Sequence, residues 1–317
     1  MMKIKQLLYS TLALSALGVA LINAPSVQAV DNQWEKPTVI YGGGLNTEEI
    51  DETLKIFGIA DDDEVLQEPA LGEDLVNYLG YGSGNTGSMI SSVYVEKDKG
   101  SGVNVTILTP DDITTITETQ YINAAITAGV EDVNIDVASI RPVTGESALT
   151  GVYKALDING EALDQERMAV AQEELESTSA IANDAELDDE QSGQLDSAIV
   201  DIKQQLAAIK EKTDEVATAE DIERIVTETL DKYNLRDIVS ADNINSLIAF
   251  FGNYQLTDAI DSAQVKEQLS NFANNLRDTL GNVWQQAEDS GLLSKISNFF
   301  SNLFHSIGNF FGGFSGE

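Results

Sequence analysis

The hydrophobic periodicity of this chain changes near residue 161, and this change constrains the fold more than any other feature of the sequence. Before it, short segments of alternating apolar and polar residues, typical of strands, alternate with segments of helical spacing. After it, the strand pattern disappears and apolar residues recur at helical intervals. We therefore expect an α/β or α+β fold, with an N-terminal mixed sheet and helices followed by an all-helical C-terminal domain of long amphipathic helices.

The N-terminal part divides into strands and helices at recognisable signals. The expected strands cover residues 38–41, 91–96, 103–108 and 132–140. The expected helices cover residues 47–57, 73–79, 117–128 and 146–155. The first of these helices follows Asn46, with Glu49 at the third helical position, which is an N-cap pattern. The glycine-rich residues 96–102 are expected to join the second and third strands as a hairpin.

The C-terminal part contains a long amphipathic helix with a heptad-like apolar stripe. The stripe consists of Leu195, Ile199, Ile202, Leu206 and Ile209. Its expected outer face carries Asp196, Asp201, Lys203, Lys210 and Glu211. Because the stripe is short, we expect it to pack within the chain rather than in an oligomeric coiled coil. The acidic residues 186–190 are expected to form an exposed connection, and further helices are expected at 219–233, 241–251 and 262–287.

The first 29 residues have the pattern of a secretory signal. Lys3 and Lys5 precede an apolar run over residues 7–22, and Val27-Gln28-Ala29 is a small-residue cleavage site. The expected organisation is therefore a signal peptide at 1–29, an α/β domain at 30–160, a helical domain at 161–287 and a tail at 288–317. The mature protein is expected to be secreted, or to be attached to the cell surface.

Charge and cysteine content exclude several classes of function. The formal net charge is −35, and such a charge repels nucleic acid and anionic polymers. We therefore expect no nucleic-acid partner. The chain has no cysteine, so it has neither disulfides nor a lipoprotein anchor. Its stability must come from a packed core, and cationic peptides, calcium or neutral surfaces are the partners that suit its charge.

The residues needed for common catalytic chemistry are nearly absent. His305, in the tail, is the only histidine of the sequence, so catalysis by Ser-His-Asp or Cys-His groups and zinc binding are not expected. Residues 82–87 match the letters of a dinucleotide-binding motif, but a helix precedes them and a strand follows. That order is the reverse of the one the motif requires. We expect a helix-to-strand loop there, and we expect the protein to be neither an enzyme nor bound to a cofactor.

The run at residues 145–149 contains a serine in a setting that suggests a nucleophile turn. The turn requires a second glycine two places after Ser147, and Leu149 stands there instead. Thr144 is the expected N-cap of the helix that follows. A pair formed by Ser147 and Lys154 would lie two helical turns apart, too far for proton transfer. The run is therefore expected to start a helix.

Carboxylates offer two alternative functions. A hydrolase with paired acids would use Glu146, Asp111 and Asp112 in one deep pocket. Calcium-dependent surface assembly would use acidic loops such as residues 61–64 and 188–190, as weak sites without an EF-hand pattern. Solvation of the surface explains most of these acids.

Three runs of the N-terminal part carry a family resemblance. They are DITTIT at residues 112–117, QYINAAITAGV at 120–130 and VTGESALTGVYKA at 143–155. Together they resemble the YpuA-like family of exported proteins of Gram-positive bacteria, a domain of unknown function. The resemblance extends over about residues 37–250, and the GESAL run is its most specific part. It implies an exported or envelope-associated protein and transfers no catalytic residue.

The C-terminal tail has the pattern of an amphipathic helix rich in phenylalanine. Its apolar face consists of Leu292, Leu293, Ile296, Phe299, Phe300, Leu303, Phe304, Ile307, Phe310, Phe311 and Phe314. The opposite face is polar and nearly uncharged, with Lys295 as its one lysine. The tail could dock on the helical domain, bind a membrane surface or bind an envelope protein. We expect an accessory or binding protein whose tail makes the contact, and the sequence does not predict its oligomeric state.

Overall fold

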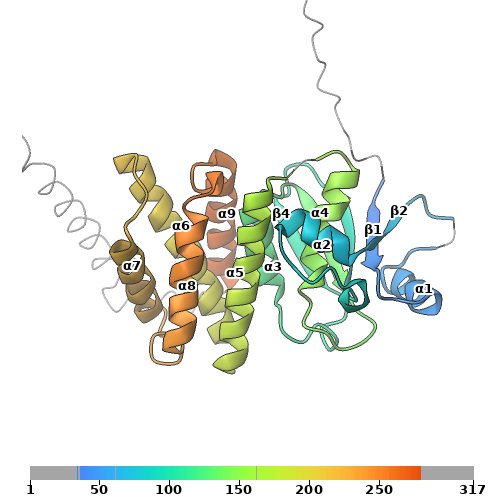
Figure 1. Ribbon diagram of the computed structural model, residues 1–317, viewed down its shortest axis with the longest axis horizontal. Helices are drawn as coiled ribbons and strands as arrows, with labels where there is room; N and C mark the ends of the chain where they lie inside the picture. Colours follow the sequence, from blue (N-terminus) through green and yellow to red (C-terminus); the bar gives the residue numbers. More distant parts are fainter. Residues whose placement is uncertain (1–33, 35, 61, 162, 280–317) are drawn as a thin grey trace, which may run out of the picture. The chain divides into compact units, whose positions relative to one another are not determined.

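The computed structural model describes residues 34, 36–60, 62–161 and 163–279 (Figure 1). The strands of this region are β1 (Thr38–Gly42), β2 (Leu66–Ala70), β3 (Ser92–Lys97), β4 (Val103–Ile107) and β5 (Val133–Ala138). Its α-helices are α1 (Thr47–Ile56), α2 (Gly72–Leu79), α3 (Glu118–Ala128), α4 (Ser147–Ile158), α5 (Gln165–Asp184), α6 (Asp189–Thr213), α7 (Ala219–Lys232), α8 (Ala241–Tyr254) and α9 (Ala263–Thr279). Two 3-10 helices, η1 (Thr86–Ser88) and η2 (Asp258–Ile260), join them. The expected class, a mixed sheet with helices followed by a helical region, is confirmed.

The strands form one mixed sheet in the order β2-β1-β3-β5-β4. β1 pairs in parallel with β2 and β4 with β5, whereas β3 runs antiparallel to both β1 and β5. Alternate residues such as Val93, Val95 and Ile135 are buried, on the face where α3 and α4 pack (Figure 1). Tyr94 and Glu96 lie between them on the other face and are partly or fully exposed. The alternation of the sequence therefore reports a sheet with one face buried under α3 and α4, while the other face is covered only in part, near Val39 and Tyr94.

The hairpin expected at residues 96–102 is wrong. β5 lies between β3 and β4, so the two strands that flank this loop are not neighbours. Gly100 and Gly102 turn the chain with positive φ, and the Asp98 N–H donates to the Asp132 carbonyl at 2.8 Å. The strand at 133–138 takes the place between them because its apolar face is buried along its whole length. α3 then provides the crossover that a parallel pair of β4 and β5 requires.

β2 was not expected, because no alternation marks it. Its first three residues are exposed, and it lies at one edge of the sheet. The Leu66 N–H donates to the Pro37 carbonyl, so Leu66, Glu68 and Ala70 turn their main chain toward β1. Pro69 faces the opposite way, where its missing N–H costs the sheet no hydrogen bond.

Local capping signals set the starts of α1 and α3, and the cap at Asn46 is confirmed. The Asn46 side chain accepts the N–H groups of Glu48 and Glu49, and the Glu49 carboxylate accepts the Asn46 N–H. Thr117 caps α3 in the same way, and Gly129 ends that helix in the left-handed conformation. The loop at residues 82–87 joins α2 to β3, in the helix-to-strand order that was expected.

α6 is buried on more sides than the sequence pattern indicated. Its apolar stripe, from Leu195 to Ile209, packs within the chain in a hydrophobic core with α7 and α8, as expected. The opposite side does not face solvent along its whole length. Asp196 and Lys203 are only 1% and 0% exposed, because α6 also packs against α3, α5 and α9. Their expected place on the outer face is therefore wrong, whereas Glu211 is exposed as expected.

The acidic residues 186–190 are largely exposed as expected, but the link between α5 and α6 ends at Asp188, and Asp189 and Glu190 form the first turn of α6. Among the helices of the described residues, none has both the length and the apolar character needed to cross a membrane.

Candidate functional site

The expected contact residues of the tail lie outside the residues that the structure describes. They are Leu292, Leu293, Ile296, Phe299, Phe300, Leu303, Phe304, Ile307, Phe310, Phe311 and Phe314. The candidate sites described below therefore belong to the region that ends with α9.

The serine of the run at residues 145–149 is held in a closed polar junction. The hydroxyls of Ser91 and Ser147 lie 2.5 Å apart, and the Ser91 hydroxyl also donates to the Gly145 carbonyl at 3.3 Å. The buried Tyr121 hydroxyl donates to the same carbonyl at 2.6 Å. Burial, and next the nearby charge of Glu146, raise the pKa of Tyr121, so this hydroxyl stays protonated. The junction ties β3, α3 and α4 together.

Neither a nucleophile turn nor a Ser–Lys pair exists at this junction. The N-cap of α4 is Glu146 rather than the expected Thr144, because Gly145 adopts φ +105° and the helix can begin only after it. Lys154 donates to Asp74 and to the Pro69 carbonyl, both at 2.7 Å, and is thus engaged two helical turns away from Ser147.

Replacing Gly145 with alanine is expected to destabilise the protein by roughly 2 kcal/mol or more, because a side chain is strained at positive φ. The added Cβ would also lie 2.5 Å from the Tyr121 hydroxyl oxygen. Urea unfolding measures the loss. Gly252→Ala is the matched control, since its Cβ would meet nothing within 4 Å in α8. That change should be neutral or stabilising. Equal stability of the two variants would contradict the role assigned to Gly145.

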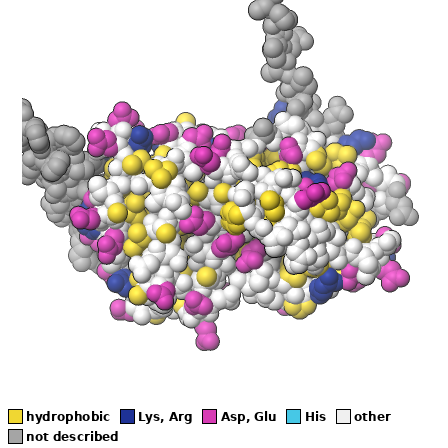
Figure 2. All heavy atoms as spheres, in the orientation of Figure 1, with side chains coloured by type: hydrophobic (Ala, Val, Ile, Leu, Met, Phe, Trp, Pro, Cys, Tyr) yellow, Lys and Arg dark blue, Asp and Glu magenta, His cyan; other side chains and the backbone are white. Residues whose placement is uncertain are grey.

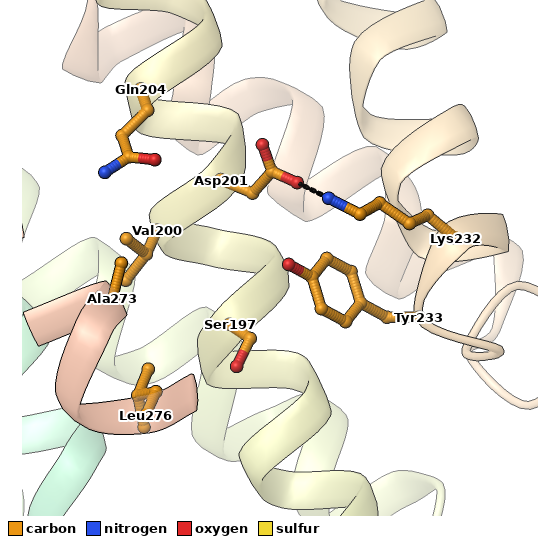
Figure 3. Close-up of a pocket in the computed structure, with 8 residues that line it drawn as sticks. All are labelled: Ser197, Val200, Asp201, Gln204, Lys232, Tyr233, Ala273 and Leu276. Atoms are coloured by element: carbon orange, nitrogen blue, oxygen red, sulfur yellow. Dashed lines mark hydrogen bonds and ion pairs between the residues drawn. The ribbon is translucent and has the colours of Figure 1, made fainter. Parts of the chain in front are cut away.

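The acids considered for a hydrolase do not line the cavities described here. Asp111 and Asp112 follow β4 in a loop, and Glu146 precedes α4. None of the three lines the pocket in Figure 3 or the groove beside β4 that is described below. Within the described ranges, no group of three or more His, Cys, Asp or Glu side chains is arranged to hold a metal ion.

A polar cluster buried between α3, α5 and α6 is the feature that the sequence pattern missed. Lys203 and Glu174 form an ion pair whose side chains are 0% and 1% exposed. Lys203 Nζ also donates to Thr127 Oγ1 at 2.7 Å and to the Asn123 carbonyl at 3.4 Å. Thr127 in turn donates to Glu174 Oε2 at 2.6 Å. All three donors of the ammonium group are thus used, which is the condition for keeping a charge in a protein interior.

Asp196 extends this cluster along α6. Its Oδ2 accepts the Thr119 hydroxyl, and its Oδ1 is buried with no hydrogen-bond partner among the described residues. Burial and, to a smaller extent, the charge of Glu174 raise the pKa of Asp196, while the Thr119 hydrogen bond and Lys203 lower it, and together these effects place it at about 7. Burial lowers the pKa of Lys203, and Glu174 opposes that shift. These titratable groups are sealed from solvent and join the sheet layer to the helices.

The pocket in Figure 3 lies between α6, α7 and α9. Asp201 and Lys232 form an ion pair of 2.6 Å at its rim, and the Lys232 ammonium lies 4.9 Å from the centre of the Tyr233 ring. Ala273 and Leu276 of α9 form its apolar wall. Its volume is about 40 Å³. Since one water needs at least ~10–15 Å³ of such space, this pocket suits a few water molecules and not an organic substrate.

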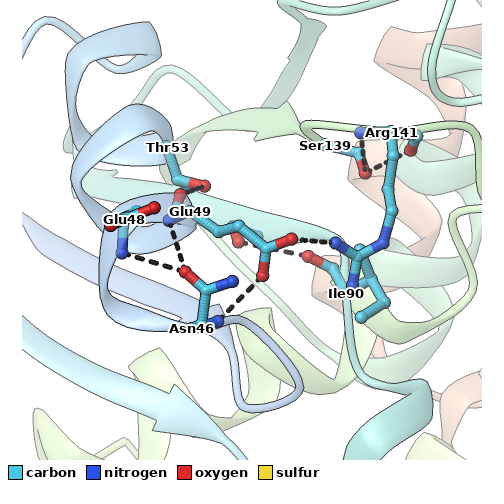
Figure 4. Close-up of polar contacts among 8 residues, drawn as sticks. Asn46, Glu48, Glu49, Thr53, Ile90, Ser139 and Arg141 are labelled. Atoms are coloured by element: carbon cyan, nitrogen blue, oxygen red, sulfur yellow. Dashed lines mark hydrogen bonds and ion pairs between the residues drawn. The ribbon is translucent and has the colours of Figure 1, made fainter.

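α1 is held against the loop after β5 by one charged contact (Figure 4). Arg141 donates to Glu49 Oε1, while Glu49 Oε2 accepts the Asn46 N–H at 2.8 Å. This main-chain hydrogen bond, with help from Arg141, holds the pKa of Glu49 below its usual value. The Phe57 and Tyr94 rings, 6.3 Å apart, make a second contact between this segment and the sheet. The arrangement positions α1 against the sheet and the loop after β5.

Comparison with known proteins gives two matches. The family model described as "Protein of unknown function (DUF1002)" matches residues 41–272. The "Uncharacterized protein YpuA" of Bacillus subtilis (strain 168) is 28% identical over 302 residues, which cover 93% of this chain and 97% of that protein. No solved structure matches the chain.

Proposed function

Because the chain belongs to the DUF1002 family of proteins of unknown function, we propose a role that its own residues support. The protein is an exported, non-catalytic accessory or binding protein of the cell envelope, and its C-terminal tail attaches it to a bilayer surface. The observation that carries this proposal is the apolar face of residues 292–314 on a chain whose net charge is −35. Apolar side chains repeated at helical spacing beside a nearly uncharged polar face are typical of interfacial helices.

The folded body supports a binding role rather than a catalytic one. Its fully buried Lys203 and Glu174 are paired with each other, burial raises the pKa of the fully buried Asp196, and the pocket of Figure 3 admits only water. On the face shown in Figure 2, Asp and Glu side chains are spread widely and outnumber Lys and Arg. Such a surface keeps the body in solution and away from anionic polymers.

Energetics favour attachment by the tail in spite of the body's charge. Burial of each large apolar side chain contributes roughly 1.5–3 kcal/mol, so a few inserted phenylalanines suffice for binding. Electrostatic repulsion between the body and an anionic surface fades within about 8 Å at physiological salt. Because the tail has Lys295 as its one lysine, we expect neutral vesicles to bind at least as well as anionic ones.

Co-sedimentation with phosphatidylcholine vesicles tests the proposal on residues 30–317. We expect the unmodified chain to sediment with the vesicles, and Phe300→Glu with Phe304→Glu to weaken binding roughly 100-fold, because two apolar contacts are lost. The matched control, Ser301→Glu with Asn302→Glu, adds the same charge to the polar face and should bind within a few fold of the unmodified chain. Absence of vesicle binding by the unmodified chain, or equal losses in both variants, would show that the tail does not attach the protein to lipid.

A further inference from the structure

A groove of about 110 Å³ lies between β4 and α9, on the side of the molecule away from β2. Val103 and Asn104 of β4 line one wall. Ile122 and Ile126 of α3 also line it, and Phe272 of α9 adds an aromatic side chain. The groove thus combines a sheet edge, an apolar surface and a helix.

Among the described residues, no strand pairs with β4 on the side away from β5, where the Ile107 N–H at its end donates to Glu118 Oε1 at 2.8 Å. The Val133 N–H donates to the Gly102 carbonyl at 2.9 Å, and the Leu108 N–H donates to the Val137 carbonyl at 2.8 Å. In a parallel pair, alternate residues turn both main-chain groups to the partner. The intervening residues, Val103 and Val105, therefore direct their N–H and C=O groups outward.

By comparison, the other edge of the sheet, at β2, is blocked. Pro69 of β2 has no N–H to offer, and Lys154 donates to its carbonyl at 2.7 Å. Edge strands of natural sheets are often protected in this way against pairing with other chains. β4 has neither proline nor lysine, so its edge is the one suited to accept a further strand.

α9 presents amide side chains to the same groove. Gln268, Asn271 and Asn275 are separated by three and four residues, so they lie along one face of the helix. Gln268 Nε2 donates to the Val130 carbonyl at 3.1 Å, while its Oε1 is buried without a hydrogen-bond partner among the described residues. Amide groups can both donate to and accept from a peptide main chain. From Gln268 to Asn275 the helix rises about 10 Å, which matches roughly three residues of an extended strand.

Charge selects among the possible ligands. None of the described residues that line the groove is charged, although the chain carries a net charge of −35. An acidic ligand would be repelled by the body as a whole, whereas a neutral or basic one would not.

From these observations we propose that the groove binds an extended, uncharged or basic segment of another polypeptide, which adds to the sheet as a strand beside β4. An open row of main-chain donors and acceptors is completed by another main chain in the extended conformation, and a helix wall with amides fixes its position. This binding does not depend on attachment of the tail to lipid.

Selection from a random heptapeptide library displayed on phage, with residues 30–317 as target, tests the proposal without assuming a sequence. We expect the selected peptides to be rich in β-forming residues and poor in Asp and Glu. Synthetic copies, measured by fluorescence anisotropy, should bind Asn271→Glu at least about tenfold more weakly, because the new charge is placed in the groove. Asn274→Glu is the matched control, on an exposed position of α9 that does not line the groove, and should bind normally.

A second variant tests the sheet edge itself. Val105→Pro removes an outward N–H and leaves the hydrogen bonds to β5 in place, so it should fold and lose the peptide. The proposal is wrong if no peptide is selected, or if both Asn variants bind equally. It is also wrong if peptides bind only after the tail is removed at Gly291, which would assign the groove to the chain's own C-terminal segment. Vesicle binding by Asn271→Glu should be unchanged. A failure of the proposed peptide binding can therefore be distinguished from a failure of the proposed attachment of the tail to lipid.

Discussion

Replacing Lys203 with methionine is expected to lower the free energy of unfolding by about 3–5 kcal/mol, because it leaves the Glu174 carboxylate buried without its partner. The pair is almost fully buried, and Lys203 also holds Thr127 and the Asn123 carbonyl. Methionine fills a similar volume, so the loss reports the charge rather than a cavity. Urea unfolding followed by circular dichroism gives the free energy for each variant.

Two further variants separate the charge from other effects. Lys210→Met is the matched control on the same helix, because Lys210 pairs with an Asp214 that is fully exposed. The free energy of unfolding of this control should change by less than about 1 kcal/mol. Lys203→Met combined with Glu174→Leu should be less destabilised than Lys203→Met alone, because no unpaired charge remains. If the double variant loses as much free energy of unfolding as Lys203→Met and Glu174→Leu lose together when measured singly, the ion pair is not the cause of the loss.

Replacing Asp196 with asparagine is expected to stabilise the protein above pH 7 and to change little below pH 4. Burial raises the pKa of Asp196 from the usual 3.8 to about 7 in the folded protein. Between these values the folded state keeps a proton that the unfolded state releases, so the contribution of Asp196 to stability falls as the pH rises. Asparagine stays neutral at every pH and keeps an oxygen to accept the Thr119 hydroxyl.

The difference between the two proteins should therefore grow from near zero at pH 4 to at most roughly 4 kcal/mol at pH 8. Urea unfolding at pH 4, 6 and 8 measures it, and the other titratable groups are common to both proteins. If the two stabilities run parallel across this range, Asp196 does not titrate within it in the folded state.

Elements with local signals were predictable from the sequence. The cap at Asn46 and the end of α3 before Gly129 depend on residues a few positions apart, and they formed as expected. The neighbour of each strand was not predictable in this way. The alternation of apolar and polar residues in β3 and β4 is the same whether these strands pair with each other or each pairs with β5. The sequence pattern is therefore compatible with both arrangements, and the predicted hairpin was the wrong one.

The polar cluster failed to appear in the sequence analysis for a related reason. Asp196 and Lys203 are seven residues apart and share a side of α6, which is the usual pattern of a solvated face. What buries them is α3 and α5, and nothing in α6 reports those helices. A sequence signal was present on α5 instead, which has no clear polar face, and in the structure its Glu174, Leu175 and Thr178 are all buried. A helix without a clear polar face is typical of one packed on several sides.

The residues proposed to contact partners also differ in whether the sequence could predict them. The tail residues follow a short-range helical pattern and stay a prediction from sequence. The groove could not be predicted, because Val103 on β4 and Asn271 on α9 come together only through the order of the strands and the path of α9. Neither residue stands out in its own segment.

α5 belongs to both halves of the fold. It contributes Met168 and Leu175 to the core beneath the sheet, and Val170 and Ile181 to the core of the helices. The change of periodicity near residue 161 is thus a boundary in the sequence and not in the packing. Exchange of either half by recombination would remove α5 side chains from the core of the other half. The family model, which runs from residue 41 to 272, accordingly describes the two halves inherited together.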